Sequence, residues 1–467
     1  MAEAIGAMGR GRSVVIVGDS KQMPPSAVMR ASHEDDSGET DDEQQAAQDM
    51  ESILSEAVES QVPRHPLTWH YRSRDESLIA FSNHRYYGRR LFSLPSPGAG
   101  ADTGLVWRRV NGTFDRGRTR TNEVEARAVV EEIARRLHDP ATANASLGVV
   151  TFNIQQRDLI LNLLEDSDDP LVTARLTEES EEPIFVKNLE NVQGDERDVI
   201  LFSLAFSTDP ATGLLPLNFG PLSQVGGERR LNVAITRARR LVMLFASFDP
   251  ADIDLSRTSA VGTRDLRAYC ELAANGPAAL SGGSLSRAAR TDEVRAAVAD
   301  AIRDRGHDVV VGYGLSDFTV DIAVRRPGAS RWQVAIILDG PQWAARPTVA
   351  DRDSAPRLLR ESMQWPALLR FYLPAWIRDR ESFLREVDEA IANAEAAEAQ
   401  ATAEAAAAGA EPGAEVQPTA AATEPGDQTA PATPAGPGAE SATPATPSQV
   451  KGARGSRERG TRRSPRK

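Results

Sequence analysis

The sequence predicts an α/β protein with a parallel-sheet domain, a second and smaller α/β domain, and a disordered tail. Between residues 65 and 250, short apolar runs alternate with helical patterns, as in a parallel sheet covered by helices. A shorter stretch at 288–395 repeats this alternation. From residue 396 to 467 the chain is rich in Ala, Pro, Thr, Glu and Gly, and it ends in a basic cluster. Such a segment buries too little apolar surface to offset its chain entropy.

Length and charge set the limits of the interpretation. The 467 residues suffice for two or three domains. The formal charge of −13 is unevenly distributed, with acid at Glu34–Glu51 and base at 451–467, so it does not exclude nucleic acid as a partner. Cys270 is the single cysteine, which excludes a disulfide framework and a cysteine-rich zinc site. Without an apolar run of membrane length or a signal-peptide pattern, we expect a cytoplasmic protein with no membrane partner.

The elements of the first half follow from their apolar patterns. Residues 1–31 contain one predicted strand, Ser13–Val17, and residues 32–64 form a predicted acidic insertion and connector. Within 65–250 we predict strands and amphipathic helices, namely strands Leu147–Thr151, Ile184–Asn188, Asp198–Ser203 and Leu241–Ala246, and helices Asn122–Leu137 and Ile154–Leu164.

The second half begins with a predicted linker at 251–287, where small residues and glycines are frequent. A helix, three strands, a helix, a strand and a closing helix to about Glu395 are predicted after it. Their ranges are Thr291–Arg305 for the first helix and Asp308–Tyr313, Phe318–Val324, Trp332–Leu338 and Leu368–Tyr372 for the strands.

Polar motifs accompany the predicted elements of the first half. GDSKQMPP follows Ser13–Val17, LTWHYRS occupies Leu67–Ser73, VQGDE occupies Val192–Glu196, and RRLNVAITRAR forms a predicted amphipathic helix over Arg229–Arg239. Each motif alone has an ordinary explanation, such as a capping loop or a solvated basic helix face. In this order, they resemble motifs III to VI of superfamily 1 helicases, in particular the Upf/Dna2-type branch. The resemblance covers about half of the chain and implies the second RecA-like domain of a P-loop NTPase fold, preceded at 1–31 by a remnant of the first.

The resemblance implies the residues that act on the phosphates of ATP. Gln22 is similar to the glutamine that senses the γ-phosphate, and Arg72 and Arg237 are similar to two arginine fingers. A fixed guanidinium stabilises the charge that develops on the transferred phosphoryl group.

Further positions match motifs that contact the nucleotide or the nucleic acid. Asp19, Gly194 and Glu196 lie in motifs that approach ATP. Thr151 and Gln156 resemble a motif that grips the phosphates of DNA or RNA, although a helix-surface role for Gln156 is also open.

The sequence lacks the loop that holds the nucleotide in this fold. That loop reads G-x-x-x-x-G-K-[ST], and this chain contains no Gly-Lys pair; its lysines are Lys21, Lys187, Lys451 and Lys467. We therefore expect the chain to begin inside the first RecA-like domain. ATP and Mg²⁺ would act as cofactors only together with an upstream polypeptide that carries the loop, and the chain alone should not hydrolyse ATP.

The second α/β unit resembles very-short-patch-repair-like, restriction-endonuclease-like domains over about residues 288–390. The resemblance implies that Glu293, Asp321 and Asp339 would hold Mg²⁺ for attack on a phosphodiester. Ile337 stands where the family usually has a glutamate, which weakens that site. An active nuclease and a nucleic-acid-binding domain that no longer cuts both remain open. For the whole chain, the alternatives to a helicase part are a nucleic-acid-binding adaptor and an Mg²⁺-dependent nuclease.

Overall fold

The computed structural model describes residues 2–23, 52–98, 102–177, 180–280, 292–344 and 348–408. Most of the predicted acidic insertion, and the tail from residue 409 onward, lie outside the described residues. Two short helices, α1 (Ala2–Met8) and α3 (Ile53–Glu59), belong to the N-terminal part.

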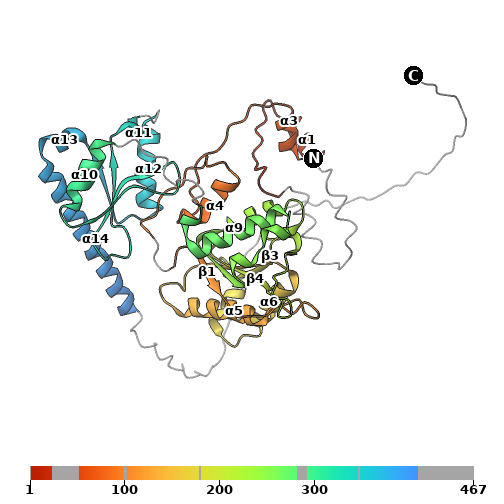
Figure 1. The fold of residues 1–467 in the computed structure, drawn as a ribbon. Coiled ribbons are helices and arrows are strands. Elements are labelled where there is room, and N and C mark those ends of the chain that lie inside the picture. The colour runs from red at the N-terminus through yellow and green to blue at the C-terminus, as the bar shows by residue number, and fades with distance from the viewer. Residues whose placement is uncertain are drawn as a thin grey trace, which may run out of the picture. The chain divides into compact units, whose positions relative to one another are not determined.

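The first sheet has five parallel strands in the order β1-β5-β4-β2-β3 (Figure 1). Four strands confirm the predicted ones within a few residues, whereas β1 was not predicted. The strands are β1 (Gly104–Arg109), β2 (Leu147–Thr151), β3 (Phe185–Asn188), β4 (Arg197–Ser207) and β5 (Ala238–Ser247).

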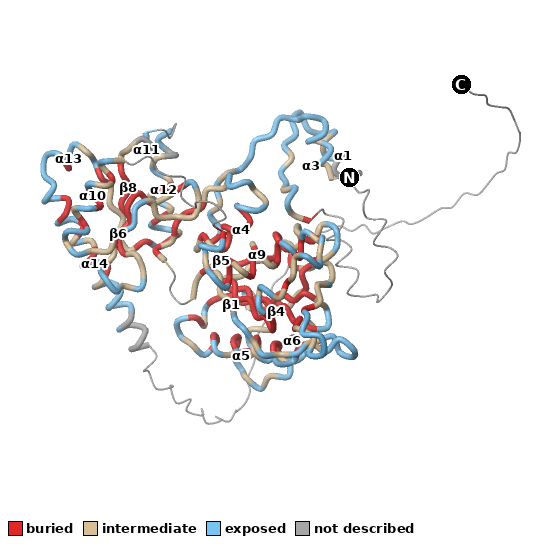
Figure 2. The backbone as a smooth tube through the Cα atoms, in the orientation of Figure 1, coloured by how far each residue is buried: buried red, intermediate tan, exposed pale blue. Residues whose placement is uncertain are grey.

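Helices cover both faces of this sheet and give it two hydrophobic cores (Figure 2). On one face lie α4 (Ser77–Arg85), α8 (Gly227–Ile235) and α9 (Val261–Asn275); on the other lie α5 (Glu123–His138), α6 (Ile154–Glu165) and α7 (Pro170–Leu176). Neighbouring residues of β4 alternate between the two cores, with Ile200 and Phe202 in one and Leu201 in the other. Burial on both faces is typical of a parallel sheet.

Three expectations for this part of the chain are wrong. Ser13–Val17 is not a strand, and Val15 and Val17 are 86% and 81% exposed, because a parallel strand needs neighbours to pair its backbone. The helix predicted over Arg229–Arg239 ends at Ile235, and β5 begins at Ala238. Within the predicted linker, Val261–Asn275 form α9, whose Tyr269 and Cys270 are fully buried.

The second sheet has the order β6-β7-β8-β9, with antiparallel pairs except for the parallel pair of β8 and β9. The predicted order of helices and strands is confirmed. The elements are α10 (Glu293–Arg303), β6 (Asp308–Tyr313), β7 (Val320–Arg325), β8 (Val334–Leu338), α11 (Pro341–Ala344), α12 (Val349–Glu361), β9 (Ala367–Phe371), α13 (Leu373–Arg378) and α14 (Arg380–Ala408). Because α14 continues to Ala408, the expectation of disorder is wrong for residues 396–408.

A buried carboxylate organises the carboxyl end of β4. Glu125 of α5 accepts hydrogen bonds from Ser203 Oγ at 2.8 Å, Ala205 N at 2.6 Å and Ser247 Oγ at 2.9 Å. Ala205 has a φ of 66°, a conformation rare for non-glycine residues, and the pairing of β4 with β5 shifts register beside it. Burial raises the pKa of Glu125 from 4.5 to about 7, although the backbone N–H of Ala205 counteracts part of that rise.

Replacing Glu125 with glutamine should flatten the pH dependence of stability. The pKa of Glu125 is higher in the folded chain, so its contribution is fully present below pH 4.5 and is lost as pH rises through about 7. That loss amounts to roughly 3 kcal/mol. Urea unfolding between pH 5 and 8 measures it: the wild-type free energy of unfolding should fall more steeply than that of the Glu125→Gln variant. Parallel pH profiles would contradict this assignment.

Candidate functional site

The predicted phosphate-contacting residues meet at the amino end of β4 and β5. Glu196 directly precedes β4 and Arg237 directly precedes β5, and these adjacent strands run parallel with Arg197 beside Ala238. The segment that carries Arg72 is held at the same edge, because the backbone N–H of Arg74 donates to the carbonyl of Arg239 at 2.7 Å. The sheet therefore brings together three motifs that lie far apart in the sequence.

Glu196 lies between two guanidinium groups. Its Oε2 is 3.0 Å from Nε of Arg72, and its Oε1 is 3.7 Å from Nη1 of Arg239. Arg239 is fixed in turn by Glu182 at 2.7 Å and by Asp198 at 3.0 Å, and its hydrogen bonds to these carboxylates raise its pKa. Arg239 was not predicted as a site residue, although it belongs to the RRLNVAITRAR motif.

Arg237 is a buried cation without a carboxylate partner among the described residues. Only 6% of the surface of Arg237 is exposed to solvent. Its Nε donates to the carbonyl of Val233 at 2.7 Å, and its Nη2 donates to Thr236 Oγ1 at 3.2 Å. Burial lowers the pKa of Arg237 and the nearby positive charge of Arg72 lowers it further, whereas the carboxylates of Glu196 and Asp195 counteract part of that decrease. Burying a charge without a counter-ion is costly, so this arrangement is suited to an anionic ligand.

The N-terminal motif joins the site through Tyr87 of the segment after α4. Tyr87 Oη donates to Asp19 Oδ2 at 2.6 Å, and Gln22 Nε2 donates to the same oxygen at 3.0 Å. Asn232 of α8 donates to Tyr87 Oη at 3.1 Å and to the carbonyl of Lys21 at 2.9 Å. Tyr87 and Asn232 were not predicted as site residues, yet they connect Asp19 and Gln22 to the helix that ends just before Arg237.

Gly194 lies in the turn before β4 with a φ of 98°, which favours glycine, and an added Cβ would meet no atom within 4 Å. This open backbone is compatible with the close approach of a ligand. The predicted role of Gly194 in nucleotide binding stays a prediction.

Thr151 and Gln156 lie at the opposite, carboxyl end of the sheet, where Thr151 of β2 is beside Ser203 of β4. Thr151 Oγ1 donates to the carbonyl of Asn153 at 2.8 Å. The Gln156 side chain is fully buried; it accepts from Asn122 N at 2.8 Å and donates to Ser203 Oγ at 3.0 Å. A helix-surface role for Gln156 is therefore wrong. Its contact with nucleic acid stays a prediction, and the buried contacts favour a structural role.

In the second domain, the acidic residues predicted to bind a metal do not converge. Asp321 of β7 is buried and paired with Arg295 of α10 at 2.7 Å. Asp339 Oδ1 accepts from the backbone N–H of Leu373 at 3.4 Å, and Glu293 is exposed at the start of α10. Across the described ranges, no group of three His, Cys, Asp or Glu side chains is arranged to hold a metal ion. The donor set therefore does not fit a magnesium site.

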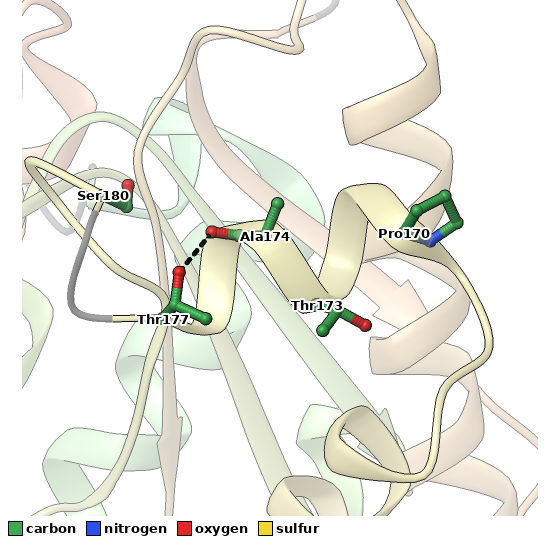
Figure 3. Close-up of a pocket in the computed structure, with 5 residues that line it drawn as sticks. All are labelled: Pro170, Thr173, Ala174, Thr177 and Ser180. Carbon is green, nitrogen blue, oxygen red and sulfur yellow. Dashed lines mark hydrogen bonds between the residues drawn. The ribbon is translucent and has the colours of Figure 1, made fainter. Parts of the chain in front are cut away.

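A surface depression beside α7 is unrelated to these residues. Pro170, Thr173, Ala174, Thr177 and Ser180 line it, and Thr177 Oγ1 donates to the carbonyl of Ala174 at 3.0 Å (Figure 3). None of the lining side chains is charged or was predicted as a site residue.

Of the helices that the structure describes, none combines the length and apolar character needed to cross a membrane.

Two protein-family models match separate parts of the chain. Residues 50–249 match the AAA domain family AAA_12, and residues 295–391 match REase_MTES_1575. These matches coincide with the two sheets. The chain thus has one part similar to an AAA domain family and another similar to a restriction-endonuclease-like family.

Curated relatives support the helicase part. Uncharacterized ATP-dependent helicases of Mycoplasma pneumoniae and Mycoplasma genitalium are each 35% identical, over 59% and 58% of this chain and 25% and 24% of their own lengths. The DNA polymerase alpha-associated DNA helicase A of Saccharomyces cerevisiae is 26% identical over 50% of this chain and 34% of its own. The chain thus spans about a quarter of the Mycoplasma relatives.

Among solved structures, the match to the C-terminal domain of a protein described as a possible DNA helicase from Lactobacillus plantarum covers 40% of this chain and 95% of that chain at 16% identity. Its TM-score of 0.23 is too low to support the fold.

Proposed function

We propose that this chain supplies the phosphate-contacting arginines and a nucleic-acid-binding surface to an ATP-driven superfamily 1 motor of the Upf/Dna2 type. One observation carries the proposal: Arg237 is a buried guanidinium with no carboxylate at ion-pair distance among the described residues, and burial and the charge of Arg72 lower its pKa. Two converging cations at the end of a parallel sheet favour a ligand with several negative charges, and the triphosphate of a nucleotide has that chemistry.

Each residue at this edge has a distinct part in the proposed chemistry. Arg237 is held in place by its hydrogen bond to the Val233 carbonyl, and its guanidinium stabilises the negative charge on the phosphate that is transferred. Arg72 exchanges Glu196 for a phosphate oxygen, since this ion pair is partly exposed and readily opened. Gln22 and Asp19 are linked to α8 through Tyr87 and Asn232. A movement of Gln22 on nucleotide binding would therefore be transmitted to α8, the helix that precedes Arg237.

Binding and cleavage of ATP require more than these residues. The sequence contains no loop whose backbone N–H groups and lysine cradle the phosphates. We propose that a separate polypeptide or region carries that loop and binds Mg²⁺. We also propose that the motor moves along DNA or RNA. The full chain alone should then bind polyphosphate without turning over ATP.

Titration calorimetry of the full chain with inorganic tripolyphosphate, and with ATP, tests this function. Arg72→Ala should weaken tripolyphosphate binding by about tenfold or more, since a charge-assisted contact is lost. The matched control is Arg127→Ala, which removes an exposed arginine paired with Glu123 on α5 and should leave the affinity unchanged. Equal affinities of the wild-type and Arg72→Ala chains would contradict the proposal.

Steady-state ATP hydrolysis with and without single-stranded DNA completes the test. We expect no turnover above that of an Arg237→Ala control. DNA-stimulated turnover that Arg237→Ala abolishes would support the role of Arg237, but it would refute the requirement for a separately supplied phosphate loop.

A further inference from the structure

We propose that, in the restriction-endonuclease-like domain, the guanidinium of Arg295 occupies the place of a divalent cation, so that this domain neither binds a catalytic metal nor cuts nucleic acid. Arg295 Nη2 lies 2.7 Å from Asp321 Oδ1, and both side chains are at most 10% exposed. The other carboxylate oxygen of Asp321 accepts the backbone N–H of Leu338 at 2.8 Å. Both oxygens that could coordinate a metal are therefore already engaged.

Neither Glu293 nor Ile337 contributes a ligand to a metal site around Asp321. Glu293 and Arg295 are two residues apart on α10, so their side chains point to nearly opposite sides of the helix. Because Arg295 faces Asp321, Glu293 faces away and is exposed. Ile337 of β8 is 3% exposed and belongs to a hydrophobic core, where it offers no ligand atom. A hard cation such as Mg²⁺ prefers oxygen ligands, and neither Glu293 nor Ile337 supplies one beside Asp321.

The energetics favour retention of the ion pair over exchange for a metal. A metal ion that entered would have to displace Arg295 and leave a buried guanidinium without this carboxylate, which is strongly destabilising in general. The sequence offers no compensating lysine, because none occurs between Lys187 and Lys451. The Arg295–Asp321 pair thus holds α10 against β7 as a structural link, and any contact of this domain with nucleic acid is independent of metal.

Metal binding to the full chain can be followed by thermal unfolding with Mg²⁺ or Mn²⁺ against a chelator. Tryptophan fluorescence is a suitable signal, because Trp332, Trp343, Trp365 and Trp376 all belong to this domain. We expect Tm to be the same in metal and in chelator, since a ligand that binds the folded state raises Tm. A saturable rise in Tm that Asp321→Asn abolishes would overturn the proposal.

Variants of α10 test the structural role of the pair. Arg295→Ala should lower Tm by several degrees, because it removes the buried ion pair with Asp321 that links α10 to β7. Arg303→Ala is the matched control: it removes a half-exposed arginine of the same helix that pairs with Asp300, and it should leave Tm nearly unchanged. Equal Tm values for the two variants would overturn the proposal. Should Arg295→Ala fail to fold, the wild-type metal titration still decides it.

Discussion

Replacing Gly227 with alanine should destabilise the first domain by on the order of 3 kcal/mol or more. Gly227 begins α8, and a Cβ there would lie 1.9 Å from the carbonyl oxygen of Leu222. The obstacle is backbone, so it cannot rotate away as a flexible side chain would. Gly262 of α9 faces the same carbonyl, at 2.3 Å from an added Cβ, so the two helices and this loop have little room to separate.

Urea unfolding followed by circular dichroism measures this loss. Gly117→Ala is the control, because an added Cβ at Gly117 meets nothing within 4 Å; its effect should stay within about 0.5 kcal/mol. A Gly227→Ala variant as stable as this control would show that the loop at Leu222 yields easily.

Replacing Arg237 with methionine should weaken tripolyphosphate binding without lowering the free energy of unfolding. Tripolyphosphate affinity should fall by on the order of a hundredfold, since the rigid buried charge is lost. The free energy of unfolding should stay the same or rise, because a buried cation without a described carboxylate partner is exchanged for an apolar side chain of similar length. The lost hydrogen bond to the Val233 carbonyl offsets part of that gain.

Calorimetric titration and urea unfolding of the same preparation measure both quantities. Arg229→Met is the control on the same helix, where Arg229 is exposed, and it should change neither quantity appreciably. A large loss of stability together with unchanged affinity would mean that Arg237 is a structural residue only.

Periodicity predicts the strands of this protein well, because a parallel strand buried on both faces reads as an apolar run. Leu147–Thr151, buried at every position, was predicted with the observed bounds. The bounds of Asp308–Tyr313 were also predicted, although β6 is an antiparallel edge strand that is only partly buried. Ser13–Val17 has the same local pattern but pairs with no strand in the described part of the chain, and the local sequence pattern alone does not reveal whether a neighbouring strand is available. The helix α9 was taken for a linker because small residues frequent in 251–287 outweighed its apolar face.

The candidate site was predictable in part, since the resemblance to superfamily 1 helicase motifs indicated Arg72, Glu196 and Arg237, which the parallel sheet brings together. Partners that depend on three-dimensional packing could not be read in the same way. Arg239 shares Glu196 with Arg72 only because β4 and β5 are neighbours. The pairing of Asp321 with Arg295 likewise depends on which side of α10 faces β7.

The double contact of Glu196 has a consequence for selectivity among anions. Arg72 already has a counter-charge, so an incoming anion must compete with a tethered carboxylate at high effective concentration. Chloride or another singly charged ion gains little from that exchange, whereas a polyphosphate also reaches the charge of Arg237. On the proposed function, Glu196 would favour ligands able to span both guanidinium groups over singly charged ions.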